Sequence, residues 1–216
     1  MKNIVIAIDG TSASGKSSTS KCIARKLGYV YVDTGAMYRT LAWHCLQKRV
    51  DLHDDKAIGA LCRSWKTKLE CVEQDGLRNV RLLVDGYYPE KEIRTSETSA
   101  AVAFIAQVPK VRAWMKKVQR DCIQFGYLVM EGRDIGTNIF PETDYKFFLD
   151  AHLEERNKRR AAEGVTENLA ERDRRDSSRA TSPLMVALGA VTINNSGKTI
   201  EETADVIIAE IEKRKP

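Results

Sequence analysis

The sequence predicts a three-layer α/β/α fold, in which a five-stranded parallel sheet lies between two layers of helices. Short apolar runs recur along the chain and alternate with segments whose apolar residues have helical spacing. The runs are continuously apolar, which is typical of parallel strands buried on both faces. At 216 residues the chain has the length of one such domain.

The predicted strands and helices follow one another in regular order. The expected strands span residues 3–7, 29–32, 127–130, 145–149 and 190–193. The expected helices span residues 16–27, 35–48, 96–124, 154–162, 167–179 and 199–214. Gly28 is expected to cap the first helix, and Pro109 divides the third, because proline fits the first turn of a helix better than its interior.

One segment departs from this alternation. Residues 66–85 hold two short strand patterns on either side of Asp75-Gly76, a dipeptide that strongly favours a hairpin turn. An antiparallel hairpin does not belong to a repeating βα pattern, so we expect a small insertion.

Composition indicates a globular protein without a membrane span. Hydrophobic residues make up 43% and charged residues 30%, a balance that argues against disorder. No apolar stretch approaches the roughly 20 residues of a transmembrane helix, and the apolar run at the N-terminus is too short for a signal peptide. The five cysteines form no C-x-x-C pair, which favours buried thiols over disulfides or zinc. We expect a cytosolic protein.

Residues 10–17 read GTSASGKS and match the phosphate-binding pattern of P-loop NTPases, G-x-x-x-x-G-K-[ST], in every defined position. Backbone N–H groups of such a loop curl around a polyphosphate, and the helix that follows adds a partial positive charge. Lys16 is expected to reach the β- and γ-phosphates, and Ser17, with Ser18 as a rival, to ligate Mg²⁺. The residues expected to bind ATP here are Gly10, Thr11, Ser12, Ala13, Ser14, Gly15, Lys16, Ser17 and Ser18.

At residues 33–39, which read DTGAMYR, the sequence resembles the bacterial cytidylate kinases, members of the nucleoside monophosphate kinase family. Those enzymes carry a D-[ST]-G-A-x-Y-R segment here, bordering the monophosphate site. Further segments agree in the family's order, and the resemblance covers nearly the whole chain. They are EIRT at 92–95 with P-x-x-R at 109–112, GRDIGT at 132–137, and ERD-x-x-D-x-x-R at 171–179.

The resemblance implies a single nucleoside monophosphate kinase domain over residues 1–216. The core would take residues 1–64 and 94–216, and the hairpin would lie in a monophosphate-binding insert at about 65–93. A short helical lid would occupy about 156–172. Its segment between Arg160 and Arg172 is shorter than the family's usual lid, which would loosen closure over ATP and broaden substrate choice.

The implied reaction moves the γ-phosphoryl group of ATP to CMP or dCMP with Mg²⁺. Such a reaction gathers many negative charges, so its catalysis is mainly positioning and charge stabilisation. The acceptor is already an anion, so no general base is needed. Helical spacing places Arg172, Asp176 and Arg179 on one helix face. The groups expected to act in the transfer are Lys16, Arg133, Arg172 and Arg179.

Other roles follow from the resemblance alone. Arg39, Arg133 and Arg179 would hold the acceptor phosphate, near Thr34. Arg172 and Asp176 would border the acceptor sugar and the transfer centre. Arg156 and Arg160 would belong to the lid over ATP. For the last two, a solvated helix face laced with ion pairs is an equal alternative.

Hydrogen-bond chemistry suggests how the base would be selected. A carboxylate only accepts and a guanidinium only donates. Asp134 facing the amino group of cytosine and Arg112 facing N3 and O2 would therefore suit CMP, whereas uracil would leave Asp134 facing an acceptor. The family's usual serine contact to the base falls at Ala103, so that contact is missing or supplied from elsewhere.

Other functions remain open at this point. One is a P-loop kinase for UMP, shikimate or dephospho-coenzyme A. Another is a nucleotide switch or RNA-binding module, suggested by the net charge of +5. The excess positive charge gathers in the proposed lid, which favours phosphate handling over nucleic acid. We expect ATP and CMP or dCMP as partners, a monomer, and no nucleic acid or membrane. Asn195 and Ser196 are placed near adenine by analogy.

Overall fold

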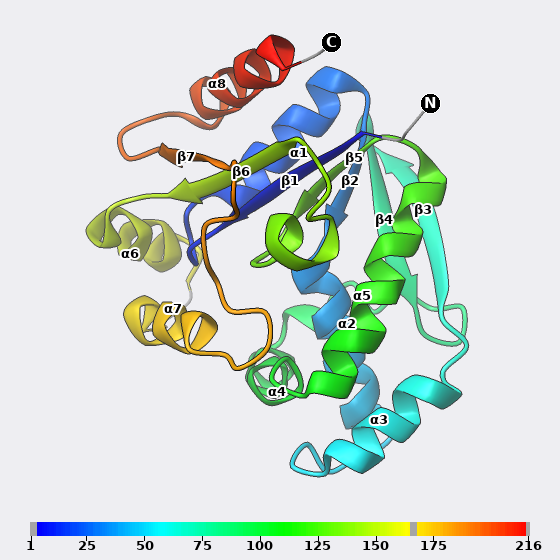
Figure 1. Cartoon of the computed structure of the whole chain (residues 1–216). Coiled ribbons are helices and arrows are strands. Elements are labelled where there is room, and N and C mark those ends of the chain that lie inside the picture. Colours follow the sequence, from blue (N-terminus) through cyan, green and yellow to red (C-terminus); the bar gives the residue numbers. More distant parts are fainter. Residues whose placement is uncertain (1–3, 165–167, 215–216) are drawn as a thin grey trace.

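The computed structural model describes residues 4–164 and 168–214 (Figure 1). The strands are β1 (Val5–Gly10), β2 (Val30–Asp33), β3 (Lys68–Gln74), β4 (Leu77–Leu83), β5 (Leu128–Glu131), β6 (Tyr145–Asp150) and β7 (Val191–Asn194). The longer helices are α1 (Lys16–Leu27), α2 (Thr34–Gln47), α3 (Asp55–Ser64), α4 (Ser96–Ile105), α5 (Pro109–Arg120), α6 (Leu153–Ala162), α7 (Leu169–Ser177) and α8 (Ile200–Lys213). Short helical turns are η1 (Glu92–Arg94), η2 (Asp121–Phe125) and η3 (Ile135–Ile139).

The described strands form one sheet in the order β3-β4-β2-β5-β1-β6-β7. All neighbours are parallel except β3 and β4. The predicted α/β class is confirmed, but the predicted number of five strands is wrong, since this sheet has seven. The hairpin pairs with β2 through Tyr31 and Asn79 and so extends the sheet.

Apolar side chains cover both faces of the sheet, as continuous apolar strands require. Along β1, Val5 and Ala7 join the core under α2, α3, α4 and α5, whereas Ile6 and Ile8 join the core under α1 and α8. Figure 1 shows these two helix layers, with α6 and α7 set apart beyond the ends of β1 and β6. The expected three layers are therefore present.

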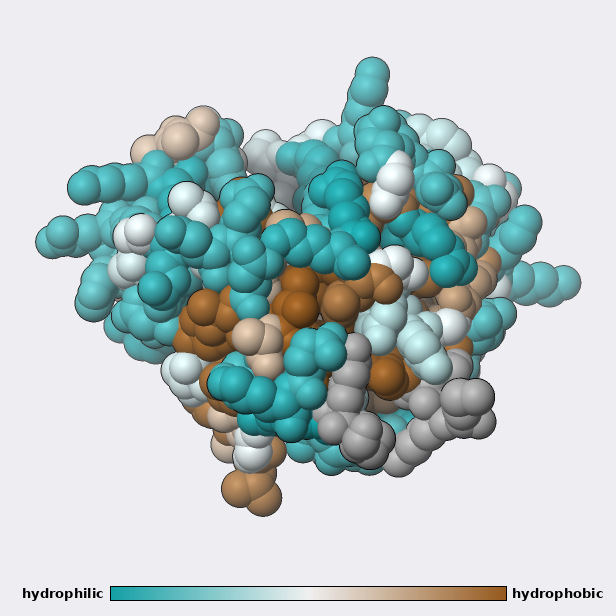
Figure 2. Space-filling view, turned by 90° about the horizontal axis from the view of Figure 1, so that it is seen from above, coloured by the Kyte–Doolittle hydropathy of each residue, from teal (hydrophilic) through white to brown (hydrophobic). Residues whose placement is uncertain are grey.

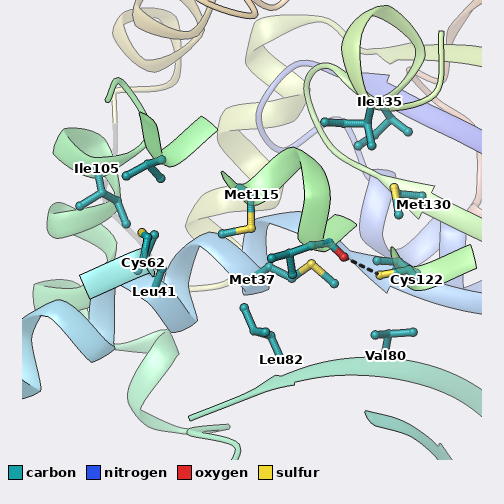
Figure 3. Close-up of a cluster of buried hydrophobic side chains, with 14 of the residues drawn as sticks. Met37, Leu41, Cys62, Val80, Leu82, Ile105, Met115, Cys122, Met130 and Ile135 are labelled. Atoms are coloured by element: carbon teal, nitrogen blue, oxygen red, sulfur yellow. Dashed lines mark hydrogen bonds between the residues drawn. The ribbon is translucent and has the colours of Figure 1, made fainter. Parts of the chain in front are cut away.

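The larger core lies between β4, β5 and the helices on their side (Figure 3). Leu41 and Met115 are completely buried in it. The five cysteines are free; Cys45, Cys62 and Cys122 are buried as expected, whereas Cys22 and Cys71 are only half-buried. The thiol of Cys122 donates to the carbonyl of Val118 at 3.7 Å.

Most predicted elements match the structure within a few residues. Gly28 caps α1 in the left-handed conformation, with φ of 68°, and Pro109 opens α5. The sequence analysis missed α3, which Asp54 caps by accepting the N–H groups of Lys56 and Ala57. Residues 3 and 167 of the predicted elements, and residues 165–167 of the predicted lid, lie outside the described residues.

Hydrophilic side chains cover most of the face seen in Figure 2, and hydrophobic ones gather near its middle. In the described part of the chain, no helix is both long and apolar enough to cross a membrane.

Replacing Leu41 by alanine tests the larger core. Because Leu41 is fully buried, L41A should lower the free energy of unfolding by about 2–5 kcal/mol. Urea denaturation followed by circular dichroism measures this change. Val206→Ala on α8, where the side chain is exposed, should shift stability by at most about 0.5 kcal/mol. Equal effects of the two variants would contradict the assigned packing.

Candidate active site

Polar and charged residues gather where the parallel strands end. The loop of residues 10–15 follows β1, Asp33 ends β2, Glu131 ends β5 and Asp150 ends β6. The carboxyl ends of parallel strands meet at one edge of the sheet, where ligands bind in such folds. The structure therefore brings the separate sequence motifs to a single edge.

The loop between β1 and α1 has the backbone that a phosphate cradle needs. Ala13 and Gly15 take left-handed conformations, with φ of 56° and 85°. A Cβ on Gly10 would lie 1.9 Å from the carbonyl oxygen of Leu149, so only glycine fits there. The loop passes close to β6, where the N–H of Thr11 donates to the carbonyl of Leu149 at 3.3 Å.

Neighbouring elements brace this loop. The carboxylate of Asp173 on α7 accepts the N–H of Ser12 at 2.9 Å and the guanidinium of Arg156. Arg156 in turn donates to the carbonyl of Ser12 at 3.1 Å. Two side chains, one from α6 and one from α7, thus hold the N–H and the carbonyl of Ser12. The side-chain amide of Asn195 donates to the carbonyl of Ser14 at 2.8 Å.

Lys16 is buried and folds back over the loop. Its ammonium group donates to the carbonyl of Thr11 and to Oγ of Ser14, the latter at 3.3 Å. Burial lowers the pKa of Lys16, and the charge of Arg133 lowers it further while Glu131 opposes the shift. Lys16 therefore lies near the residues that end β5.

Glu131 connects α1 to the sheet. Its carboxylate accepts hydrogen bonds from Oγ of Ser17 at 2.9 Å and from the hydroxyl of Tyr31. Burial, followed by the charge of Asp33, raises the pKa of Glu131. A hydroxyl beside a carboxylate supplies the hard oxygen donors that Mg²⁺ prefers. The residues present thus fit a divalent cation at Ser17, while exposed Ser18 has no such partner among the described residues.

Asp9 connects β1 to the segment that follows β5. Its carboxylate accepts the N–H groups of Ile135 and Gly136, both at 2.8 Å. Burial raises the pKa of Asp9 to about 6, although these two hydrogen bonds act in the opposite direction. The strand that carries the loop is therefore tied to the segment that follows Arg133 and Asp134.

An arginine cluster surrounds Asp176 on α7. Arg133 donates to Asp176 at 2.9 Å, and Arg179 donates to its other oxygen. Although burial acts in the opposite direction, Arg133, Arg179 and Arg172 hold the pKa of Asp176 below its ordinary value. Arg133 and Arg172 also lower the pKa of Lys16. The predicted catalytic groups thus lie close enough together to interact electrostatically.

A second charged group lies at the start of α2. Asp33 caps the helix through the N–H of Ala36 and pairs with Arg39 at 3.2 Å and Arg94 at 3.6 Å. Thr34 donates to the carbonyl of Glu131 at 2.7 Å. A Cβ on Gly132 would lie 2.8 Å from this hydroxyl and 2.7 Å from Cδ1 of Ile135, so a larger residue there would displace both side chains.

Arg112 and Asp134 form a buried ion pair at 2.8 Å. Among the described residues, Nε of Arg112 has no hydrogen-bond partner, and neither have the buried Nε atoms of Arg39 and Arg179. Buried N–H groups normally find a partner. Three arginines therefore offer donors that the described protein atoms do not use.

Several contacts here were not expected from the sequence. Asp9 and Glu131 were treated only as strand ends, although an acidic residue closing an apolar run is itself a signal. Asp173 and Arg159 were assigned no contact of their own. Arg159 donates to the side-chain oxygen of Asn195 at 3.2 Å.

The sequence analysis also considered Arg160 and Ala103. Arg160 pairs with Glu163 on α6 at 2.7 Å, and Ala103 is half-buried on α4.

The raised pKa of Asp9 predicts a specific pH dependence. A carboxyl group whose pKa is higher in the folded state stabilises the fold below its unfolded pKa, and this stabilisation is lost as the pH rises through the folded pKa. Relative to Asp9→Asn, the free energy of unfolding of the native chain should therefore fall by roughly 2 kcal/mol between about pH 4 and pH 7. Urea titrations at several pH values measure this difference, and a constant difference would contradict it.

The chain is similar to known proteins over nearly its whole length. A family model described as cytidylate kinase matches residues 6–213. The chain is 41% identical to the cytidylate kinase of Geobacillus thermodenitrificans, over 99% of this chain and 98% of that one. It is 40% identical to the cytidylate kinase of Bacillus licheniformis, over 99% and 98% of the two chains.

One solved structure supports the fold alone. An uncharacterized protein from Eubacterium ventriosum has a TM-score of 0.53 at 16% identity, covering 99% of this chain and all of that one. The family match spans the loop after β1, the residues that end β2 and β5, and the arginine cluster around Asp176. The chain belongs to the cytidylate kinase family.

Proposed function

We propose that this protein transfers the γ-phosphoryl group of ATP to CMP or dCMP, giving ADP and CDP or dCDP. The observation that carries this proposal is the arginine cluster around Asp176, which lies near Lys16. A cluster of guanidinium groups beside a phosphate-binding loop suits two phosphate groups that must approach each other.

The donor would occupy the loop after β1. Its backbone N–H groups would cradle the phosphates, and Lys16 would exchange its contacts with Thr11 and Ser14 for phosphate oxygens. Ser17 would hold Mg²⁺, oriented by its hydrogen bond to Glu131. When bound, Mg²⁺ would neutralise charge on the phosphates while keeping several water ligands.

The acceptor would lie on the side of α2 and α7. Arg39, Arg133 and Arg179 would hold its phosphate, with Thr34 alongside. Arg172 and Asp176 would border the sugar and the transfer centre. An oxygen of the acceptor phosphate would attack the γ-phosphorus of ATP, and the bond to the β-γ bridging oxygen would break to release ADP. The attacking oxygen is already anionic, so no side chain needs to remove a proton.

The base would be read by the buried pair of Arg112 and Asp134. Nε of Arg112 is an unused donor, which suits the acceptors N3 and O2 of cytosine. Asp134 can only accept while it is ionised, which suits the amino group. Uracil presents a carbonyl oxygen at that position and would leave two acceptors facing each other.

The surrounding segments would complete the site. We infer that residues of about 65–93 flank the monophosphate and that residues of about 156–172 form a lid over ATP. Arg160 would contact ATP from this lid. Arg156 would act through the loop itself, since it donates to the carbonyl of Ser12. ATP and CMP are small molecules of the cytoplasm, where we expect the protein to act as a monomer.

A coupled assay for ADP release tests the reaction. We expect rapid turnover of CMP and dCMP with Mg-ATP, because both present the amino group and the phosphate that the site would bind. Turnover of UMP should be slow, and AMP, GMP, shikimate and dephospho-coenzyme A should be inactive. A chain that phosphorylates none of the nucleotides would rule the proposal out.

Exchanging Asp134 for asparagine tests how the base is read. The carboxamide can donate to the carbonyl of uracil, so the ratio of kcat/KM for CMP over UMP should fall by about tenfold or more. Asp75→Asn in the β3–β4 turn is a matched control, because Asn-Gly fits the same turn. If D134N keeps the ratio of the native chain, the base is read elsewhere, and Ala103 is then the first position to examine.

A further inference from the structure

Asn138 lies one helical turn after Asp134, in the π-helical turn η3. The N–H of Asn138 donates to the carbonyl of Asp134 at 2.9 Å, which brings the two side chains onto the same side of the turn. The side-chain amide of Asn138 donates to Oδ2 of Asp134 at 3.0 Å. Asn138 therefore contacts the carboxylate that we assign to the base.

Every polar atom of the Asn138 side chain is used. Its oxygen accepts from the ammonium of Lys116 on α5 at 3.0 Å. Its nitrogen donates to Asp134 and also to Oγ of Ser182 at 2.9 Å, in the loop after α7. The amide links α5, η3 and the loop after α7 through these three contacts.

Lys116 determines which way the amide points. An ammonium group can only donate, so it selects the amide oxygen and turns both N–H groups toward Asp134 and Ser182. In the reverse orientation, the amide oxygen would face the carboxylate of Asp134 and the amide nitrogen would face the ammonium of Lys116. Both contacts would then be unfavourable. Lys116 thus keeps a donor directed at Asp134.

The hydrogen bonds to Asp134 are unequally distributed over its two oxygens. Oδ2 accepts from Arg112 at 2.8 Å and from Asn138 at 3.0 Å. Among the residues that the structure describes, Oδ1 receives no donor. Two donors on one oxygen fix the plane of the carboxylate and leave the other oxygen to accept from a ligand.

We propose that Asn138, oriented by Lys116, is a positioning residue that fixes Asp134 for recognition of the cytosine amino group. The proposal rests on the proposed function, since it assigns Asp134 to the base. Without Asn138 the carboxylate could rotate away from the carbonyl of uracil, and the penalty against UMP would shrink. Asn138 would therefore set base specificity without touching the substrate.

The test measures kcat/KM for CMP and for UMP in three variants. Asn138→Ala removes the donor and should lower the CMP/UMP ratio by about tenfold, the usual effect of losing a hydrogen bond to a charged group. Lys116→Met frees the amide to turn and should lower the ratio by a smaller factor. Lys117→Met removes an exposed charge from the same helix and should leave the ratio unchanged.

The double variant separates positioning from a general structural effect. Lys116 would act only through Asn138, so N138A with K116M should have the ratio of N138A alone. An unchanged ratio in folded N138A would overturn the proposal. If N138A does not fold, K116M decides alone, and an unchanged ratio there would overturn it too. Failure of the proposed function is distinct, because the native chain would then phosphorylate neither CMP nor UMP.

Discussion

The geometry of the site depends on one contact, the carboxylate of Asp9 between the N–H groups of Ile135 and Gly136. Asp9 precedes the phosphate-binding loop directly, and Ile135 directly follows Asp134. In a phosphoryl transfer, the donor and acceptor must be positioned relative to each other to within about an ångström. A buried carboxylate that joins the two segments fixes their separation, at the cost of desolvating a charge.

The same edge holds most of the buried charges of the described chain. They include Asp9, Lys16, Arg112, Glu131, Asp134, Arg156 and Asp176. Buried ion pairs contribute little net stability compared with apolar packing. The two apolar cores on either side of the sheet stabilise the fold instead. The charges are concentrated where a highly charged substrate pair would be bound, which is the pattern of a functional site rather than a structural one.

The sequence predicts the elements of this fold better than it predicts their pairing. Apolar runs identify β1, β2, β5, β6 and β7, because a strand that is buried on both faces needs a continuous run of apolar residues. Pairing of the hairpin with β2 requires no such run, and the predicted number of strands was therefore wrong. The phosphate-binding loop can be predicted from the sequence because its residues, 10–17, are consecutive. Asp173 and Ser12 are 161 positions apart in the sequence, so no local sequence pattern predicts their contact.

A crystal structure with CMP and a non-hydrolysable ATP analogue is the most direct test of these assignments. We predict that the amino group of cytosine lies about 3 Å from Oδ1 of Asp134, at ordinary hydrogen-bond distance. We also predict that Lys16 leaves the carbonyl of Thr11 for the phosphates of the donor. A cytosine ring turned away from Asp134, or CMP bound away from the arginine cluster around Asp176, would contradict them.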